Sequence, residues 1–108
     1  MTNEHPLDEL YATIVARKSS SASKSYTAQL LKRGVVQCAK KLGEEGVEAA
    51  LAAVGGKKKE IVEESADVLY HLLVVWAATG IKPKAVYDVL GARRARSGLA
   101  EKKSRKRK

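Results

Sequence analysis

Two short acidic motifs contain the residues best suited to chemistry. The first motif holds Glu44, Glu45 and Glu48, and the second holds Glu64 and Asp67. Side chains three residues apart share one face of an α-helix, so Glu45 projects beside Glu48 and Glu64 beside Asp67. Apolar residues flank both motifs, which predicts that the two acidic faces lie where amphipathic helices pack together.

Four carboxylates in such a place repel one another, and burying an unpaired carboxylate is costly. A bound cation would remove both penalties. Carboxylate oxygens on facing helices suit Mg²⁺, with Mn²⁺ as the alternative, and helical bundles commonly hold metals in this way. The sequence therefore predicts a metal site formed by Glu45, Glu48, Glu64 and Asp67.

Other polar residues near the motifs have two interpretations each. His71 follows the second motif on the same helical stripe, and it is either a fifth ligand or, as we favour, a structural residue beside Tyr70. Helix faces rich in glutamate are common on protein surfaces, so Glu44, Glu60 and Glu63 are also compatible with ordinary exposed positions.

The elements that position these motifs are all predicted to be helices, because apolar residues recur at three- and four-residue intervals and no stretch alternates as a strand would. Ser25 is a predicted N-cap, and Pro83 fits a first helical turn. Gly55 and Gly56 end one helix and form a tight turn, which makes the two acidic helices antiparallel neighbours. The expected fold is an all-α bundle of four to five helices, covering residues 7–17, 26 to the interruption at Gly34, 35–54, 58–78 and 83 onward.

The core-facing positions of the two long helices are mostly small or aliphatic. Gly43 and Gly46 lie among them and indicate either a closely approaching backbone or simple tolerance of glycine. The predicted packing positions are Val35, Cys38, Ala39, Leu42, Ala49, Ala50 and Ala53 on the first long helix, and Ile61, Ser65, Val68, Leu69, Leu72, Leu73 and Trp76 on the second.

The chain of 108 residues suits one domain with a modest core. It has no Phe and one Trp, so Leu, Val and Ala must form a thin core, which a second copy would complete in a homodimer. Its one cysteine, Cys38, excludes a disulfide framework and is predicted to be a buried apolar residue. The sequence shows neither a bilayer-length apolar run nor a signal-peptide pattern, so we expect a cytoplasmic protein without membrane association.

The net charge of +9 is concentrated near the C-terminus, because residues 91–108 hold nine of the 21 Lys and Arg residues. The rest of the chain is nearly neutral, so the basic excess is typical of a solvated tail, and a nucleic-acid partner is not expected. We expect a disordered leader at 1–6, a helical domain at 7–96 and a basic tail at 97–108.

The combined motifs resemble a known family. Three glutamates in the pattern E-E-x-x-E, followed by E-x-x-D, resemble the signature of the all-α NTP pyrophosphatase superfamily, which includes the MazG-type enzymes. The flanking sequence is similar to that of phosphoribosyl-ATP pyrophosphohydrolases over about residues 7–105. The strings that carry this resemblance are SYTA at 25–28, AKKLGEE at 39–45, ESADVLYHLL at 64–73 and SGLAEKK at 97–103. Gly46 departs from the usual alanine of the family but removes no ligand.

The resemblance implies hydrolysis of 1-(5-phosphoribosyl)-ATP between its α and β phosphates, the second step of histidine biosynthesis. It implies Mg²⁺ on the four carboxylates, attack by an activated water with Glu44 or Glu48 as the base, and a homodimer. Lys41 shares a stripe with Glu45 and Glu48 and would reach a phosphate. Further phosphate ligands would come from other helices or another subunit, the candidates being Lys24, Arg93 and Arg94.

Three other functions remain open at this point. A house-cleaning nucleoside triphosphate pyrophosphatase would use the same scaffold on non-standard nucleotides. A nucleic-acid-binding protein would use the basic tail and would bind with a steep dependence on salt. A non-catalytic dimerisation module would tolerate loss of the acidic residues, because they would then bind no metal.

Overall fold

The computed structural model describes residues 5–22 and 24–94, and this part of the chain is helical without any strand. The predicted all-α fold class is therefore confirmed. The elements in chain order are α1 (Pro6–Ala16), the 3-10 turn η1 (Arg17–Ser19), α2 (Tyr26–Arg33), α3 (Val35–Gly55), α4 (Lys58–Thr79) and α5 (Pro83–Arg94).

Local capping signals determine where the helices begin. The Ser25 hydroxyl accepts a hydrogen bond from the Ala28 N–H at 3.1 Å, so α2 starts as predicted. The His5 Nδ1 accepts one from the Leu7 N–H at 3.1 Å, so α1 begins at Pro6, within the predicted leader. Residues 1–4 of that leader and the predicted tail at 97–108 lie outside the described residues.

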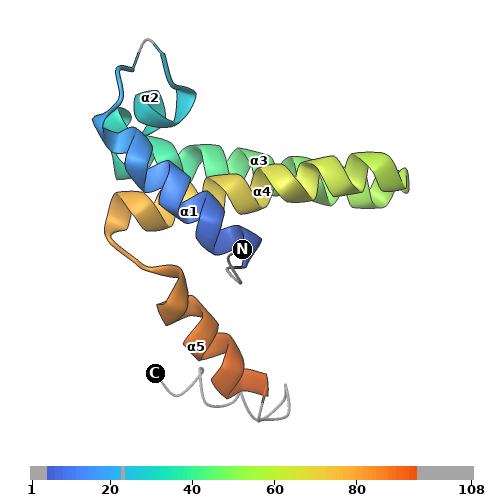
Figure 1. Cartoon of the computed structure of the whole chain (residues 1–108). Helices are drawn as coiled ribbons and strands as arrows, with labels where there is room; N and C mark the ends of the chain where they lie inside the picture. Colours follow the sequence, from blue (N-terminus) through green and yellow to red (C-terminus); the bar gives the residue numbers. More distant parts are fainter. Residues whose placement is uncertain (1–4, 23, 95–108) are drawn as a thin grey trace.

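The turn between α3 and α4 depends on Gly56. Its φ of 78° lies in the left-handed region, where a side chain would be strained. Only Gly56 and Lys57 lie between the two helices, since α4 begins at Lys58, where the sequence predicted its start. This short turn makes α3 and α4 side-by-side partners along their length (Figure 1).

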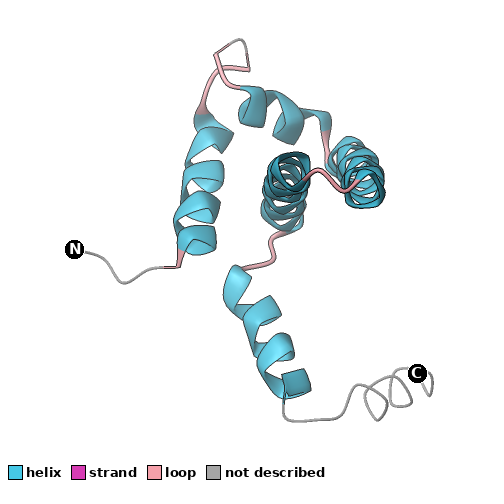
Figure 2. Ribbon diagram, turned by 90° about the vertical axis from the view of Figure 1, so that its right-hand side faces the viewer, coloured by secondary structure: helices cyan, strands magenta, loops and turns pink. Residues whose placement is uncertain are grey.

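Figure 2, which looks along the two long helices, shows α1 and α2 beside the α3/α4 pair. These two helices lie toward one end of the pair (Figure 1), and the core is formed where the four helices meet. Its buried residues are Ile14, Leu30, Cys38, Leu73, Val74, Trp76 and Ala77. Burial of Cys38 confirms its predicted apolar role, and its thiol donates to the Leu30 carbonyl at 3.3 Å. The helix α5 packs mainly on α1.

Beyond this core, α3 and α4 project as a two-helix arm, which we define as residues 43–69 (Figure 1). Several predicted packing positions on the long helices are solvent-exposed in the single chain, and four of them lie on the arm, which α1 and α2 do not cover. These positions are Val35, Ala39, Ala50, Ala53, Ser65 and Leu69. The sequence periodicity predicted these as packing positions, and within the described single chain they are not covered; the expected second copy that would cover them stays a prediction.

The glycines of the arm have open surroundings. A methyl group added at Gly43 or Gly46 would meet no neighbouring side chain or other helix within 4 Å. A close backbone approach, one of the two interpretations of these glycines, is therefore not present within the described chain. In the same described part, no helix is both long and apolar enough to cross a membrane.

Paired glycine substitutions test this description of the arm. Gly43→Ala should raise the free energy of unfolding by about 1 kcal/mol, because it removes backbone entropy from the unfolded chain without creating a clash. Gly56→Ala should lower it by about 1 kcal/mol, because alanine is strained at a positive φ. Urea unfolding measures both values. A destabilising Gly43→Ala would show that another backbone packs against this helix.

Candidate active site

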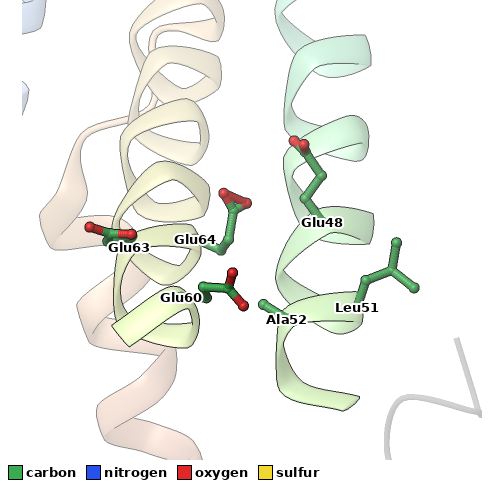
Figure 3. Close-up of a pocket in the computed structure, with 6 residues that line it drawn as sticks. All are labelled: Glu48, Leu51, Ala52, Glu60, Glu63 and Glu64. Atoms are coloured by element: carbon green, nitrogen blue, oxygen red, sulfur yellow. The ribbon is translucent and has the colours of Figure 1, made fainter. Parts of the chain in front are cut away.

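The acidic motifs meet between α3 and α4, as the sequence predicted. The helix α3 provides Glu45 and Glu48, and the antiparallel α4 provides Glu64 and Asp67. Glu48 and Glu64 face the space between the two helices (Figure 3). The two helices interact electrostatically, because the charges of Glu48 on α3 and Asp67 on α4 raise the pKa values of both Glu45 and Glu64. We call these four residues the acidic cluster.

Two members of the acidic cluster have raised pKa values. The pKa of Glu45 is raised to about 7, first by its hydrogen bond with Glu48, then by burial, and then by the charges of Glu48 and Asp67. Burial and the same neighbouring charges also raise the pKa of Glu64. The carboxylates of the acidic cluster therefore repel one another, and either a proton or a metal cation would reduce this repulsion.

A cavity of about 460 Å³ opens beside the acidic cluster, toward the turn between α3 and α4. Its lining residues are Glu48, Leu51, Ala52, Glu60, Glu63 and Glu64. Figure 3 shows the Glu63 carboxylate directed away from Glu48, whereas Glu64 points toward α3. The Glu64 Oε2 is buried and has no hydrogen-bond partner.

The chemistry of the donors fits a hard divalent cation, because the acidic cluster offers only carboxylate oxygens and one of them is buried without a partner. Within the described residues, however, no three His, Cys, Asp or Glu side chains are already arranged to hold a metal ion. Rotation of the flexible glutamate side chains is therefore needed to gather the oxygens around one point.

The predicted base candidates differ in their surroundings. Glu48 is hydrogen-bonded to Glu45 and lines the cavity. Glu44 is about half exposed, at 48%, and its Oε1 lies 3.3 Å from the Lys41 Nζ. That bond to Glu44 is the main reason why the pKa of Lys41 is raised, so Lys41 keeps its positive charge beside the acidic cluster.

The other predicted phosphate ligands are farther from the carboxylates. Lys24 is exposed in the connection that precedes α2. Arg93 and Arg94 belong to the last turn of α5, which leaves the α3/α4 pair and packs mainly on α1 (Figure 1). The described chain therefore brings Lys41 to the acidic cluster but does not bring the two arginines there.

An aromatic group beside the acidic cluster was not predicted from the sequence. His71 is buried, and its Nε2 lies 3.9 Å from the Glu45 Oε1. Burial lowers the pKa of His71, which favours a neutral ring and agrees with the structural role we preferred. Its ring contacts Tyr70 and Tyr26, and the Tyr70 hydroxyl is hydrogen-bonded to the Thr27 hydroxyl.

Comparison with known sequences identifies the family. The sequence model of the family described as phosphoribosyl-ATP pyrophosphohydrolase matches residues 7–94. A phosphoribosyl-ATP pyrophosphatase of Azospirillum brasilense is 51% identical over 100 residues, which cover 93% of this chain and 90% of the relative. Another, from Parvibaculum lavamentivorans, is 54% identical over 99 residues, covering 92% of this chain and 91% of the relative. The chain therefore belongs to the phosphoribosyl-ATP pyrophosphohydrolase family.

Proposed function

We propose that this phosphoribosyl-ATP pyrophosphohydrolase of histidine biosynthesis works with Mg²⁺ held by Glu45, Glu48, Glu64 and Asp67. The observation that carries the proposal is the acidic cluster itself, in which the charges of Glu48 and Asp67 raise the pKa values of Glu45 and Glu64 across two facing helices. Bound there, Mg²⁺ would neutralise charge on the triphosphate and on the leaving pyrophosphate. Mn²⁺ has the same preference for oxygen ligands and is the alternative metal.

In the reaction, a water oxygen forms a bond to phosphorus while the anhydride bond between the α and β phosphates breaks. The products are phosphoribosyl-AMP and pyrophosphate. We assign the proton of the attacking water to Glu48, because this carboxylate lines the cavity and is hydrogen-bonded to Glu45. Glu44 is the weaker candidate, since it is paired with Lys41.

The positive charge that meets the substrate phosphates comes from Lys41. Its ammonium group lies on the side of α3 that carries the acidic cluster, and its bond to Glu44 keeps it charged. Lys24 is exposed near the start of α2 and is a second candidate. Arg93 and Arg94 would act only from another subunit, since α5 of the same chain is directed elsewhere.

We also propose a homodimer in which the arms of two chains pack together. The arm exposes apolar side chains on both helices: Val47 (61%), Leu51 (65%), Val54 (87%) and Val62 (67%). Clustered exposed apolar residues of this size are typical of protein interfaces. Two paired arms would form a four-helix bundle around the acidic clusters, which would shield the sites from bulk solvent.

The substrate also supports a location in the cytoplasm. A nucleotide with several phosphate charges does not cross a lipid bilayer unaided, because the charges would have to leave water. The enzyme therefore needs to be in the compartment where its substrate is made.

The metal site is tested by Glu64→Gln beside the matched control Glu63→Gln on the same helix. We expect Glu64→Gln to lower pyrophosphate release from phosphoribosyl-ATP with Mg²⁺ by about 100-fold or more, because a transition-state charge loses its stabilisation. Glu63→Gln should stay within a few-fold of the unmodified protein. Thermal unfolding should show Glu64→Gln folded and no less stable, since a repelling charge is removed.

Two results would contradict this assignment. Full activity of Glu64→Gln would exclude Glu64 as an essential metal ligand. Turnover of dUTP in preference to phosphoribosyl-ATP would indicate the house-cleaning function on the same scaffold.

The raised pKa of Glu45 predicts that the stabilising effect of Mg²⁺ depends on pH. The folded pKa of about 7 exceeds the ordinary value of 4.5, so the folded protein retains a proton that the unfolded chain releases between these values. Without metal, stability from this group is present at low pH and is lost as the pH rises through 7. The increase in Tm caused by Mg²⁺ should therefore be larger at pH 8 than at pH 6.5.

The Mg²⁺-dependent increase in Tm is measured by thermal unfolding with Mg²⁺ and with EDTA, for the unmodified protein and for Glu45→Gln. Burial lowers the pKa of His71, which destabilises the fold at acidic pH and opposes this effect, so the comparison with Mg²⁺ and with EDTA is made within each protein. An Mg²⁺ effect that is the same at both pH values would argue against proton–metal competition at Glu45.

The dimer is tested by Leu51→Lys, with Val89→Lys on α5 as a control at another exposed apolar position. A lysine in the centre of a packed interface buries an unpaired charge, so Leu51→Lys should shift the protein to monomers in sedimentation velocity. Val89→Lys should leave the dimer intact. Dimers that persist with Leu51→Lys would place the interface outside the arm.

A further inference from the structure

The ring of Tyr26 is exposed but held in a fixed position. Tyr26 is the first residue of α2, directly after the Ser25 cap, and 51% of its surface is open to solvent. The Tyr70 ring lies nearly parallel to it, with centroids 6.5 Å apart and an interplanar angle of 23°. The buried His71 ring meets it edge-on at 6.2 Å. A large aromatic surface is thus presented to solvent on a rigid support.

The support is fixed from two helices. Tyr70 and His71 lie in α4 and contact each other at a centroid distance of 4.9 Å. The hydrogen bond between the Tyr70 and Thr27 hydroxyls joins α4 to α2. Because this bond involves the residue next to Tyr26, it restricts the start of α2 and the ring that the helix carries.

This aromatic surface adjoins the acidic cluster. His71 lies between them, with its ring 6.2 Å from that of Tyr26 and its Nε2 3.9 Å from the Glu45 carboxylate. Lys41 also lies close enough to interact electrostatically with both Tyr26 and Glu45. If a molecule binds with its phosphates at the acidic cluster, the part of the molecule attached to those phosphates would therefore be able to reach the exposed Tyr26 ring.

We propose that Tyr26 is the stacking surface for the adenine base of the substrate, supported by Tyr70 and His71. This inference rests on the proposed function, because it assumes that the phosphates lie at the acidic cluster. A purine is a flat aromatic group that stacks favourably on tyrosine. The cavity on the other side of Glu48 is lined by four glutamates with only Leu51 and Ala52 as apolar contacts, so it offers no comparable surface.

The test measures binding of two probes that share phosphates but not a base, AMP and inorganic tripolyphosphate, by calorimetry with Mg²⁺. The variants are Tyr26→Leu, which removes the ring, and Tyr26→Phe, which keeps it. Gln29→Leu is the control for an exposed position on the same helix. Tyr26→Leu should weaken AMP binding by about 10-fold, the order expected for one lost stacking contact, and should leave tripolyphosphate binding unchanged.

Tyr26→Phe and Gln29→Leu should bind both probes as the unmodified protein does. In steady-state kinetics, Tyr26→Leu should raise KM for phosphoribosyl-ATP more than it lowers kcat. Equal AMP binding by Tyr26→Leu and the unmodified protein would overturn the proposal, and so would an equal loss of both probes. A Tyr26→Leu protein that only changes its association state would make Tyr26 an interface residue instead.

These outcomes are separate from a failure of the proposed function. Calorimetry does not require turnover, so AMP binding that depends on the Tyr26 ring would support the stacking surface even if the protein released no pyrophosphate. Normal pyrophosphate release together with ring-independent AMP binding would support the reaction and overturn the stacking surface.

Discussion

Mutual repulsion among the carboxylates of Glu45, Glu48, Glu64 and Asp67 is the constraint on which the rest of the structure depends. Two helices that carry this charge on facing sides would separate unless other contacts held them together. The short turn at Gly56 joins them at one end, and the core beneath α1 and α2 joins them at the other. The repelling groups are therefore held in place, and the Mg²⁺ that we propose would relieve their repulsion.

The elements that depend on neighbouring residues could be predicted from the sequence. Ser25 caps α2, Gly56 ends α3 and Pro83 begins α5, because capping and backbone strain are decided within one helical turn. The pairing of the two acidic motifs was predictable for a related reason. A two-residue turn makes the second helix run antiparallel beside the first. The turn and the residue spacing together therefore indicated which carboxylates face one another.

What could not be predicted depends on how distant helices cross. The contact of Tyr26 and Thr27 with Tyr70 and His71 requires α2 to lie across α4, and no periodic pattern in either helix specifies that crossing. Ser25 and Tyr26 stand next to each other in the sequence, but the sequence pattern predicted only the Ser25 cap and not the aromatic contact of Tyr26. For the same reason, periodicity identified the apolar side of α3 without showing that α1 and α2 end before the arm.

The one-sided position of the core has a consequence for local unfolding. Buried apolar contacts are concentrated around Leu73, Val74 and Trp76, whereas the turn end of α3 and α4 has few. Backbone amides near Gly56 should therefore exchange with solvent through openings of the arm alone, at lower free energy than amides near Trp76. The acidic cluster and the exposed apolar side chains share this weakly held segment. If the proposed metal and the proposed second copy both bind it, ordering of the arm by one would lower the entropy cost of binding the other, so the two events would be cooperative.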